Sequence, residues 1–186
     1  ARKLVEEARR EIALTLGIKG MLLPGQILFT SCGSEANDTA VLGCLYSKEK
    51  RRQNKVITTA SEHPSVEMAM RRLEADGLEV VRIVTRGGAL DTEAAIAALA
   101  EPTVLVSMMM VNNETGARYD VARVFAAAKA KDSRTVTHCD AVQGFLKVPF
   151  TPSGISADLV TVSAHKIHGP KGVGALFVSQ RLLERR

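Results

Sequence analysis

The sequence predicts a three-layer α/β/α sandwich with a mainly parallel sheet, and three observations point to this fold class. Short apolar runs alternate with helical patterns through most of the chain, as in βαβ units. The run at 103–110 is almost continuously apolar, as expected of a strand that is buried on both faces. A length of 186 residues with 46% apolar residues is enough for one domain with a sizeable core.

The first half of the chain alternates between helices and strands. Residues 3–16 place Val5, Ala8, Ile12 and Leu16 on one face, which predicts an amphipathic helix. Proline is favoured in the first turn of a helix and glycine just after its end. We therefore expect, in order, a strand at 27–30, a helix from the small-residue turn at 31–37 to about Lys50, a strand at 56–59, a helix from Pro64 to Gly77 and a strand at 78–84.

The second half continues this alternation as far as its last two strands. Asp91 and Asp120 are suited to cap two alanine-rich helices, which end near Ala100 and Lys131. Strands are expected at 103–110, 135–138, 159–163 and 173–178. A glycine-rich loop without a helical pattern joins the last two strands. They are either antiparallel neighbours or joined by a connection that crosses the sheet.

Composition narrows the class of protein. The net charge of +5 comes from basic residues spread along the chain, aromatic residues make up 4% and tryptophan is absent. A solvated surface is therefore the preferred interpretation, and nucleic-acid binding is the weaker alternative. No apolar run is long enough to span a bilayer, and no signal-peptide pattern opens the chain, which predicts a cytoplasmic protein without a membrane partner.

Three widely spaced cysteines, Cys32, Cys44 and Cys139, form no Cys-x-x-Cys pair. This spacing favours reduced thiols over a disulfide framework or a metal site, and each cysteine is interpreted as a small core residue. Both ends of the chain suggest a piece of a longer protein. Ala1 starts within a helical pattern without a cap, and Arg186 lies inside another charged helical pattern.

Polar residues follow most of the predicted strands. In open α/β sheets ligands collect at the carboxyl ends of the strands, so we expect these residues to share one edge of the sheet. They are Ser34, His63, Asn113, Asp140, Gln143, Ser163, His165 and Lys166.

Each of these residues also has an ordinary structural explanation. Ser34 is most simply a helix N-cap, Asn113 a turn residue, and Asp140 a cap of the next helix. His63 and Gln143 are more often packed or surface residues when taken singly. A single lysine such as Lys166 is more often exposed than catalytic, and the loop after it does not match a P-loop pattern.

Taken together, the residues fit pyridoxal phosphate. This cofactor needs a lysine amine for a Schiff base, an acidic partner for its pyridine nitrogen and a phosphate cup. Lys166 supplies the amine and Asp140 is the best-placed acid. A cup can be built from Ser34 at a helix N-terminus together with Ser163 and His165, and His63 could lie over the ring face.

Five stretches of the chain, at 29–37, 61–66, 111–116, 138–144 and 163–172, carry a family resemblance. They resemble the cofactor-binding large domain of the Nif/Isc-type cysteine desulfurases. These are class V aminotransferase-like enzymes with the fold-type I architecture. The stretches span nearly the whole chain in the family's order. The resemblance implies that residues 1–186 are this large domain, without the family's N-terminal segment and C-terminal small domain.

The resemblance implies a role for each site residue. Lys166 would hold pyridoxal phosphate and, with His63, would be catalytic; His63 would stack on the ring and assist proton transfers. Asp140 would pair with the pyridine nitrogen and Gln143 with the ring hydroxyl. The remaining contacts would come from Gly33, Ser34, Ser163 and His165 around the phosphate, and from Asn113 at the cofactor hydroxyl or the substrate carboxylate.

The implied reaction removes sulfur from L-cysteine and leaves L-alanine and an enzyme-bound persulfide. That persulfide would feed iron–sulfur cluster assembly or other sulfur transfer, through a scaffold or sulfur-carrier protein, and the enzyme would be a homodimer. In the family the nucleophilic cysteine and an arginine that holds the substrate lie after the stretch matched here. Residues 1–186 alone are therefore expected to be inactive.

Two alternatives stay open. Another fold-type I enzyme, such as a selenocysteine lyase or an aminotransferase, would share most of these residues, although 112–116 and 163–166 favour the desulfurase. A non-catalytic nucleotide- or nucleic-acid-binding α/β module would use the basic surface and the glycine loop. Lys171, in that loop, competes with Lys166 as the cofactor lysine.

Overall fold

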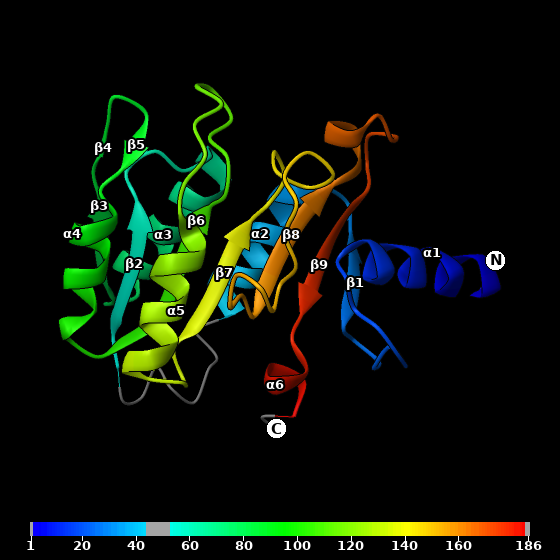
Figure 1. Cartoon of the computed structure of the whole chain (residues 1–186), viewed down its shortest axis with the longest axis horizontal. Coiled ribbons are helices and arrows are strands. Elements are labelled where there is room, and N and C mark those ends of the chain that lie inside the picture. Colours follow the sequence, from blue (N-terminus) through cyan, green and yellow to red (C-terminus); the bar gives the residue numbers. More distant parts are fainter. Residues whose placement is uncertain (1, 44–52, 185–186) are drawn as a thin grey trace.

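The computed structural model describes residues 2–43 and 53–184. Their centre is a seven-stranded sheet with the order β1-β9-β8-β7-β6-β2-β3 (Figure 1). The strands are β1 (Ile27–Thr30), β2 (Lys55–Thr59), β3 (Glu79–Ile83), β6 (Thr103–Met109), β7 (Val136–Asp140), β8 (Leu159–Ser163) and β9 (Gly174–Val178). Neighbours from β8 to β3 are parallel, whereas β9 is antiparallel to both β8 and β1. The predicted mainly parallel sheet is confirmed, and its last two strands are antiparallel neighbours.

Helices cover both faces of the sheet and give the three predicted layers (Figure 1). On one face α2 and α3 pack together, and α2 contacts β7, β8 and β9. On the other face α4 and α5 pack together, and α5 contacts β6 and β7. The helices are α1 (Arg2–Thr15), α2 (Gly33–Leu42), α3 (Pro64–Ala75), α4 (Thr92–Ala97), α5 (Val121–Lys131) and α6 (Gln180–Leu183). Among the helices of the described residues, none is long and apolar enough to cross a bilayer.

Two apolar cores lie on the two faces of the sheet. Successive strand residues point to opposite faces, so Leu105 packs into the core beneath α2 and α3, whereas its neighbour Val106 packs into the core beneath α4 and α5. All residues of β2, β6, β7 and β8 are buried. This double burial accounts for the continuous apolar run predicted at 103–110, which ends at Met109 as a strand.

The predicted helix caps are present. The Asp91 carboxylate accepts a hydrogen bond from the Ala94 N–H at the start of α4, and Asp120 does the same for Arg123 in α5. Pro64 opens α3 as predicted. These caps satisfy N–H groups of the first helical turn that have no partner within the helix.

The first helix differs from its predicted packing. Of the face predicted to be buried, Leu16 lies in the core, but Val5 is 42% exposed and Ala8 is also exposed. Only the end of α1 reaches the body of the protein, and its other turns project away from the sheet (Figure 1). Arg9 contributes to this contact by donating to the Ile27 carbonyl at 3.1 Å.

The segment after β3 and the end of α2 are compared with the predicted elements as follows. A short hairpin, β4 (Thr85–Arg86) and β5 (Ala89–Leu90), was not predicted; Gly87 and Gly88 have φ values of 57° and 81°, as a tight two-residue hairpin turn requires. The helix predicted to run to Lys50 is present as α2 as far as Leu42. Its remainder and Cys44 lie outside the described residues.

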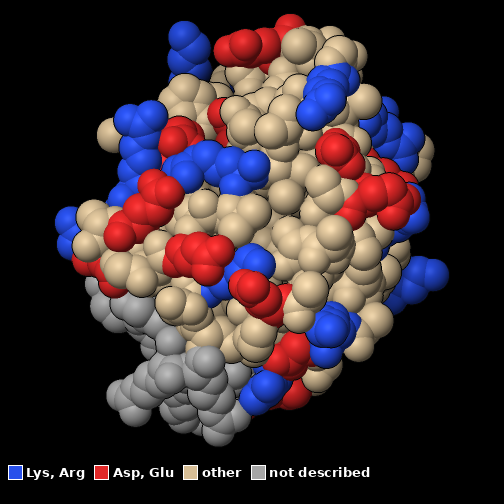
Figure 2. All heavy atoms as spheres, turned by 90° about the vertical axis from the view of Figure 1, so that its left-hand side faces the viewer, with Lys and Arg blue, Asp and Glu red and all other residues tan. Residues whose placement is uncertain are grey.

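The face that Figure 2 shows carries charged side chains of both signs. Basic and acidic side chains alternate there without a large patch of one sign. Several form ion pairs, and Arg82 contacts both Glu67 and Glu74. Such mixed charge is typical of a solvated surface and does not favour nucleic-acid binding on this face.

The start of β9 is packed against the turn that follows β1. A methyl group on Gly174 would lie 2.5 Å from the carbonyl carbon of Cys32 and 2.7 Å from Thr30 Oγ1. We expect Gly174→Ala to lower the free energy of unfolding by about 1–3 kcal/mol, because the Cys32 backbone and the Thr30 side chain would have to move. Urea unfolding measures the change.

Gly43 is the matched control for Gly174. It has a helical φ of −54°, and no described atom lies within 4 Å of an added methyl group. Gly43→Ala should leave stability unchanged or raise it by up to ~1 kcal/mol. Equal effects of the two substitutions would show that close packing at Gly174 is not what requires glycine.

Candidate active site

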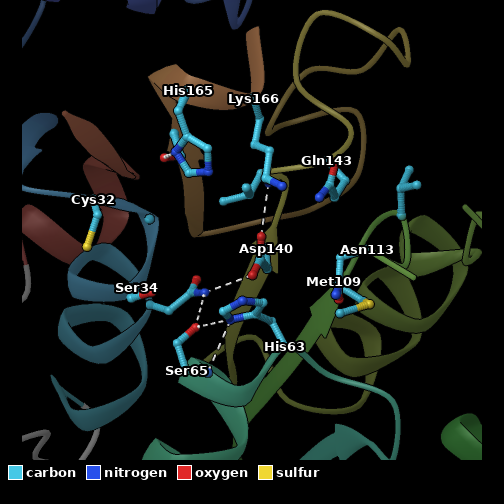
Figure 3. A pocket seen from close by; sticks show the side chains of 15 residues that line it. Cys32, Ser34, His63, Ser65, Met109, Asn113, Asp140, Gln143, His165 and Lys166 are labelled. Atoms are coloured by element: carbon cyan, nitrogen blue, oxygen red, sulfur yellow. Dashed lines mark hydrogen bonds between the residues drawn. The ribbon is translucent and has the colours of Figure 1, made fainter. Parts of the chain in front are cut away.

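A pocket of about 190 Å³ lies at the carboxyl ends of β6, β7 and β8, beside the N-termini of α2 and α3 (Figure 3). This volume is room for a small ring with substituents. All residues of the predicted site line it: Gly33, Ser34, His63, Asn113, Asp140, Gln143, Ser163, His165 and Lys166. The structure therefore brings the whole predicted set together at one edge of the sheet.

Asp140 is the last residue of β7 and is 6% exposed. Its Oδ2 accepts from Asn37 Nδ2 at 2.7 Å, and its Oδ1 accepts from the Val142 N–H at 2.9 Å. The expected cap of a following helix is wrong, because Asp140 is followed by a turn. Burial raises the pKa of Asp140, and the two hydrogen bonds oppose this shift. A buried carboxylate of this kind is stabilised by a cationic partner in the pocket.

Lys166 enters the pocket from the 3₁₀ turn Ala164–Ile167, which directly follows β8. Its side chain is half-buried, and none of the described residues forms a hydrogen bond or ion pair with its amine. The turn ends at His168, whose φ of 64° reverses the chain, and the Gly169 N–H donates to the Ala164 carbonyl at 2.9 Å. Lys171 is exposed and does not line the pocket. The geometry therefore favours Lys166 over its competitor.

An anion-binding corner lies where α2 meets the end of β8. The N-cap of α2 is Cys32, with no side-chain hydrogen bond to the helix, so Ser34 lies inside the first turn and its N-cap interpretation is wrong. A methyl group on Gly33 would lie 2.9 Å from Val142 Cγ2, so glycine allows the helix start to approach this corner closely. Ser163 Oγ and His165 Nδ1 are 2.9 Å apart beside it. Uncapped helix N–H groups with such donors suit a phosphate.

His63 and Ser65 form the opposite side of the pocket from Lys166 and His165 (Figure 3). His63 is the N-cap of α3, and its Nδ1 accepts from the Ser65 N–H at 3.2 Å. Ser65 Oγ lies 2.9 Å from the same nitrogen. The ring is thus fixed by the start of the helix, as a ring that stacks on a cofactor should be.

Two asparagines, Asn112 and Asn113, lie in the turn after β6 and have different surroundings. Asn112 is buried; its Oδ1 accepts from the N–H groups of Glu114 and Thr115, and its Nδ2 donates to the Ser61 carbonyl at 3.0 Å. Asn113 is exposed and lines the pocket. The predicted site included only Asn113, but Asn112 shapes the turn and attaches it to the segment before His63.

Gln143 lies in the turn that follows Asp140. It is half-buried and reaches the pocket, so its interpretation as an ordinary surface residue is not supported. Its predicted contact with a ring hydroxyl stays a prediction.

The cysteines differ from one another. Cys139 is buried in the core, as expected. Cys32 is half-buried and lines the pocket, so its interpretation as a core residue is wrong. The pKa of Cys32 is lowered, chiefly because the nearby backbone N–H of Glu35 at the start of α2 favours the thiolate.

Glu62 was missed by the sequence analysis, although it precedes His63 directly. Its Oε1 accepts from Thr59 Oγ1 at 2.6 Å and from the Met109 N–H at 3.0 Å. Its Oε2 is buried and has no partner among the described residues. Burial raises the pKa of Glu62 to about 8, and the nearby Asp140 carboxylate adds to this shift. Glu62 is therefore mainly protonated at neutral pH and ties the His63 segment to the end of β6.

We expect Glu62→Gln to remove a pH dependence of stability. The folded protein keeps a proton on Glu62 up to about pH 8, whereas the unfolded chain releases it near its ordinary value of 4.5. The free energy of unfolding of the wild type therefore falls as pH rises between these values, by up to ~1.4 kcal/mol per pH unit from this group. The amide does not ionise, so the variant should gain about 2–4 kcal/mol relative to the wild type between pH 5 and pH 8.

Urea unfolding near pH 5 and near pH 8 measures this difference. Glu79→Gln, at an exposed position on β3, is the matched control and should follow the wild-type profile. Parallel profiles for Glu62→Gln and the wild type would contradict a buried, protonated Glu62.

This fold and this pocket define a class of protein. The family model described as Aminotransferase class-V matches residues 1–186, and the chain belongs to this family. Within it, the predicted resemblance to cysteine desulfurases is confirmed. The cysteine desulfurase of Enterobacter agglomerans is 41% identical over 175 residues, which cover 94% of this chain and 42% of that protein.

Two further proteins are similar to nearly the whole of this chain. The cysteine desulfurase IscS of Anaeromyxobacter dehalogenans is 38% identical over 182 residues, which cover 97% of this chain and 43% of that protein. The crystal structure of DndA from Streptomyces lividans has a TM-score of 0.84 at 36% identity and covers 95% of this chain and 48% of that one. The chain thus spans less than half the length of these relatives.

Proposed function

We propose that the protein is a pyridoxal phosphate-dependent cysteine desulfurase and that residues 1–186 are its large, cofactor-binding domain. The observation that carries the proposal is the convergence of Lys166, Asp140 and the anion-binding corner at α2 in one small pocket. The names of the relatives support the choice of reaction.

The donor set of the pocket fits the cofactor. Among residues 2–43 and 53–184, the pocket offers an amine without a partner, a buried carboxylate without a cation and an uncapped helix N-terminus. These are the three groups that an aldehyde, a pyridine nitrogen and a phosphate require. When bound, pyridoxal phosphate supplies an electron sink that weakens bonds at the carbons of an amino acid.

Each residue of the pocket then has its own role. Lys166 Nζ would hold the cofactor and would supply the amine that moves a proton at the substrate. Asp140 holds a proton on the ring nitrogen, and Gln143 donates to or accepts from the ring hydroxyl. Ser34, Ser163 and His165 bind the phosphate with the α2 N-terminus, with Gly33 allowing close approach. Asn113 orients the ring hydroxyl or the substrate carboxylate, and the His63 ring covers the cofactor face.

The overall reaction we propose transfers the sulfur of L-cysteine to a cysteine thiol. The carbon–sulfur bond of the substrate breaks, a sulfur–sulfur bond forms on the protein, and the three-carbon product leaves as L-alanine. Cys139 is buried in the core, so it is not suited to this thiol. We propose, as the family resemblance implies, that the thiol comes from a part of the enzyme outside residues 1–186.

The family resemblance also supports three broader proposals. We propose that the enzyme is a homodimer in the cytoplasm and that its persulfide passes to an iron–sulfur scaffold or a sulfur-carrier protein. Residues 1–186 without the rest of such an enzyme should not release sulfur.

The test uses the natural full-length protein that carries residues 1–186, loaded with pyridoxal phosphate and given L-cysteine and a thiol reductant. Equimolar L-alanine and sulfide are expected. Turnover of selenocysteine but not cysteine would identify a selenocysteine lyase instead, and a keto acid product would identify an aminotransferase. Absence of cofactor binding would favour a non-catalytic module.

A further inference from the structure

A chain of hydrogen bonds connects Asp140 to His63 across the floor of the pocket (Figure 3). Its centre is Asn37 in α2, which is 2% exposed. Asn37 Nδ2 donates to Asp140 Oδ2 at 2.7 Å and to Ser65 Oγ at 3.1 Å. The two hydrogens of one amide thus join β7 to the first turn of α3.

The direction of each bond in this chain can be assigned. The Ser65 N–H can only donate, so His63 Nδ1, which accepts from it at 3.2 Å, carries no proton. Ser65 Oγ must therefore donate in its 2.9 Å contact with the same nitrogen. The oxygen of that hydroxyl accepts from Asn37. The hydrogen bonds run from Asn37 to Asp140 on one side, and from Asn37 through Ser65 to His63 on the other.

The orientation of the Asn37 amide is fixed at a cost to stability. Its Oδ1 is buried and has no partner among the described residues. If the amide were rotated so that Oδ1 and Nδ2 exchanged places, the oxygen would face the Ser65 hydroxyl, which can donate. It would also face the Asp140 carboxylate, which can only accept, so the rotated amide is disfavoured. A buried, unpaired polar atom that persists in this way indicates a constraint other than stability.

We propose that Asn37 is a positioning residue that fixes the Asp140 carboxylate and, through Ser65, holds His63 as the tautomer with its proton on Nε2. The part that concerns the cofactor rests on the proposed function. A neutral ring in this tautomer has no free nitrogen to accept a proton, because Nε2 carries one and Nδ1 already accepts two hydrogen bonds. His63 then presents a fixed ring whose Nε2–H is the group that donates a hydrogen bond or a proton in the pocket.

The test reads the His63 tautomer directly by ¹⁵N NMR of the imidazole nitrogens in the natural full-length protein without cofactor. The His63 signals are identified by their loss in His63→Gln. The wild type should show the Nε2–H form alone. Ser65→Ala removes the hydroxyl but leaves Asn37 and Asp140 in place, and the tautomer ratio should shift toward Nδ1–H by about fivefold, the equivalent of one net hydrogen bond.

Two further variants distinguish a positioning role of Asn37 from a general loosening of the pocket. Asn37→Leu should shift the same ratio and also weaken pyridoxal phosphate binding, because it removes the hydrogen bond to the Asp140 carboxylate as well. Ser61→Ala is the matched control. Ser61 lies in the same segment as His63 and Ser65, but its hydroxyl contacts the Tyr119 hydroxyl and takes no part in the hydrogen bonds that connect Asp140 to His63. It should keep the wild-type ratio.

The tautomer measurement needs no cofactor, so it is independent of whether the proposed function holds. An Nδ1–H form in the wild type would overturn the inference, even if the enzyme proved to be an active desulfurase. An unchanged ratio in Ser65→Ala would do the same, including if Asn37→Leu failed to fold. Loss of cofactor binding in the wild type would count against the proposed function alone.

Discussion

Replacing Lys166 with alanine should abolish the visible absorbance of bound pyridoxal phosphate and lower L-cysteine desulfurase activity by at least about a thousandfold. The side chain enters the pocket from the turn after β8, and its amine has no partner among the described residues. No other lysine in the described part of the chain lines this pocket. The loss should therefore be one of covalent attachment and of proton transfer, which no neighbouring amine can restore.

Lys171→Ala is the matched control for this prediction. Lys171 lies five positions further along the same loop, is exposed and does not line the pocket. Its removal should leave absorbance and activity at wild-type values. Absorption spectra of the two variants after loading with cofactor separate the cases. Normal absorbance in Lys166→Ala, or its loss in Lys171→Ala, would refute the assignment.

Asp140→Asn should lower activity by at least about 100-fold while leaving the folded state as stable as the wild type. Asp140 has no cation in contact among the described residues, and burial raises its pKa. An amide fills the same space and has no charge to desolvate, which offsets the loss of one of the two hydrogen bonds that Asp140 accepts. It cannot, however, hold a proton on a ring nitrogen. The cost should therefore appear in catalysis and in the cofactor spectrum, and not in urea unfolding.

Asp158 is the informative comparison because it is equally buried but lies before β8, at the opposite end of the sheet. Burial alone would raise its pKa, but contacts with Arg181 and Lys129 lower it overall. Asp158→Asn should cost about 3 kcal/mol of stability, because two cations lose their buried partner, with the cofactor spectrum unchanged. Equal effects of the two substitutions on stability and activity would contradict the division between a catalytic and a structural carboxylate.

The fold could be predicted because local patterns and the overall architecture agree. The apolar run of β6, the caps Asp91 and Asp120, and Pro64 each reflect a local requirement that the structure fulfils. The packing of α1 could not be predicted, because periodicity identifies an apolar face but not what covers it. The direction of β9 was likewise open, since a glycine-rich loop permits either connection.

The candidate site was predictable where residues follow strands directly. Asp140 and Lys166 lie at strand ends, and the rule that ligands bind there locates them without any contact map. Asn37 and Ser65 were not singled out, because their significance comes from contacts that span 103 and 28 residues of sequence. Glu62 was overlooked for a similar reason: a buried carboxylate is recognised only once its surroundings are known.

The most direct test of the central claim is to reduce the cofactor-loaded protein with borohydride and to map the modified peptide by mass spectrometry. Reduction makes the bond between pyridoxal phosphate and its lysine permanent, so the label reports the attached residue. The pocket geometry predicts the label on Lys166. A label on Lys171 or on any other lysine, or no label at all, would contradict the claim that Lys166 holds the cofactor.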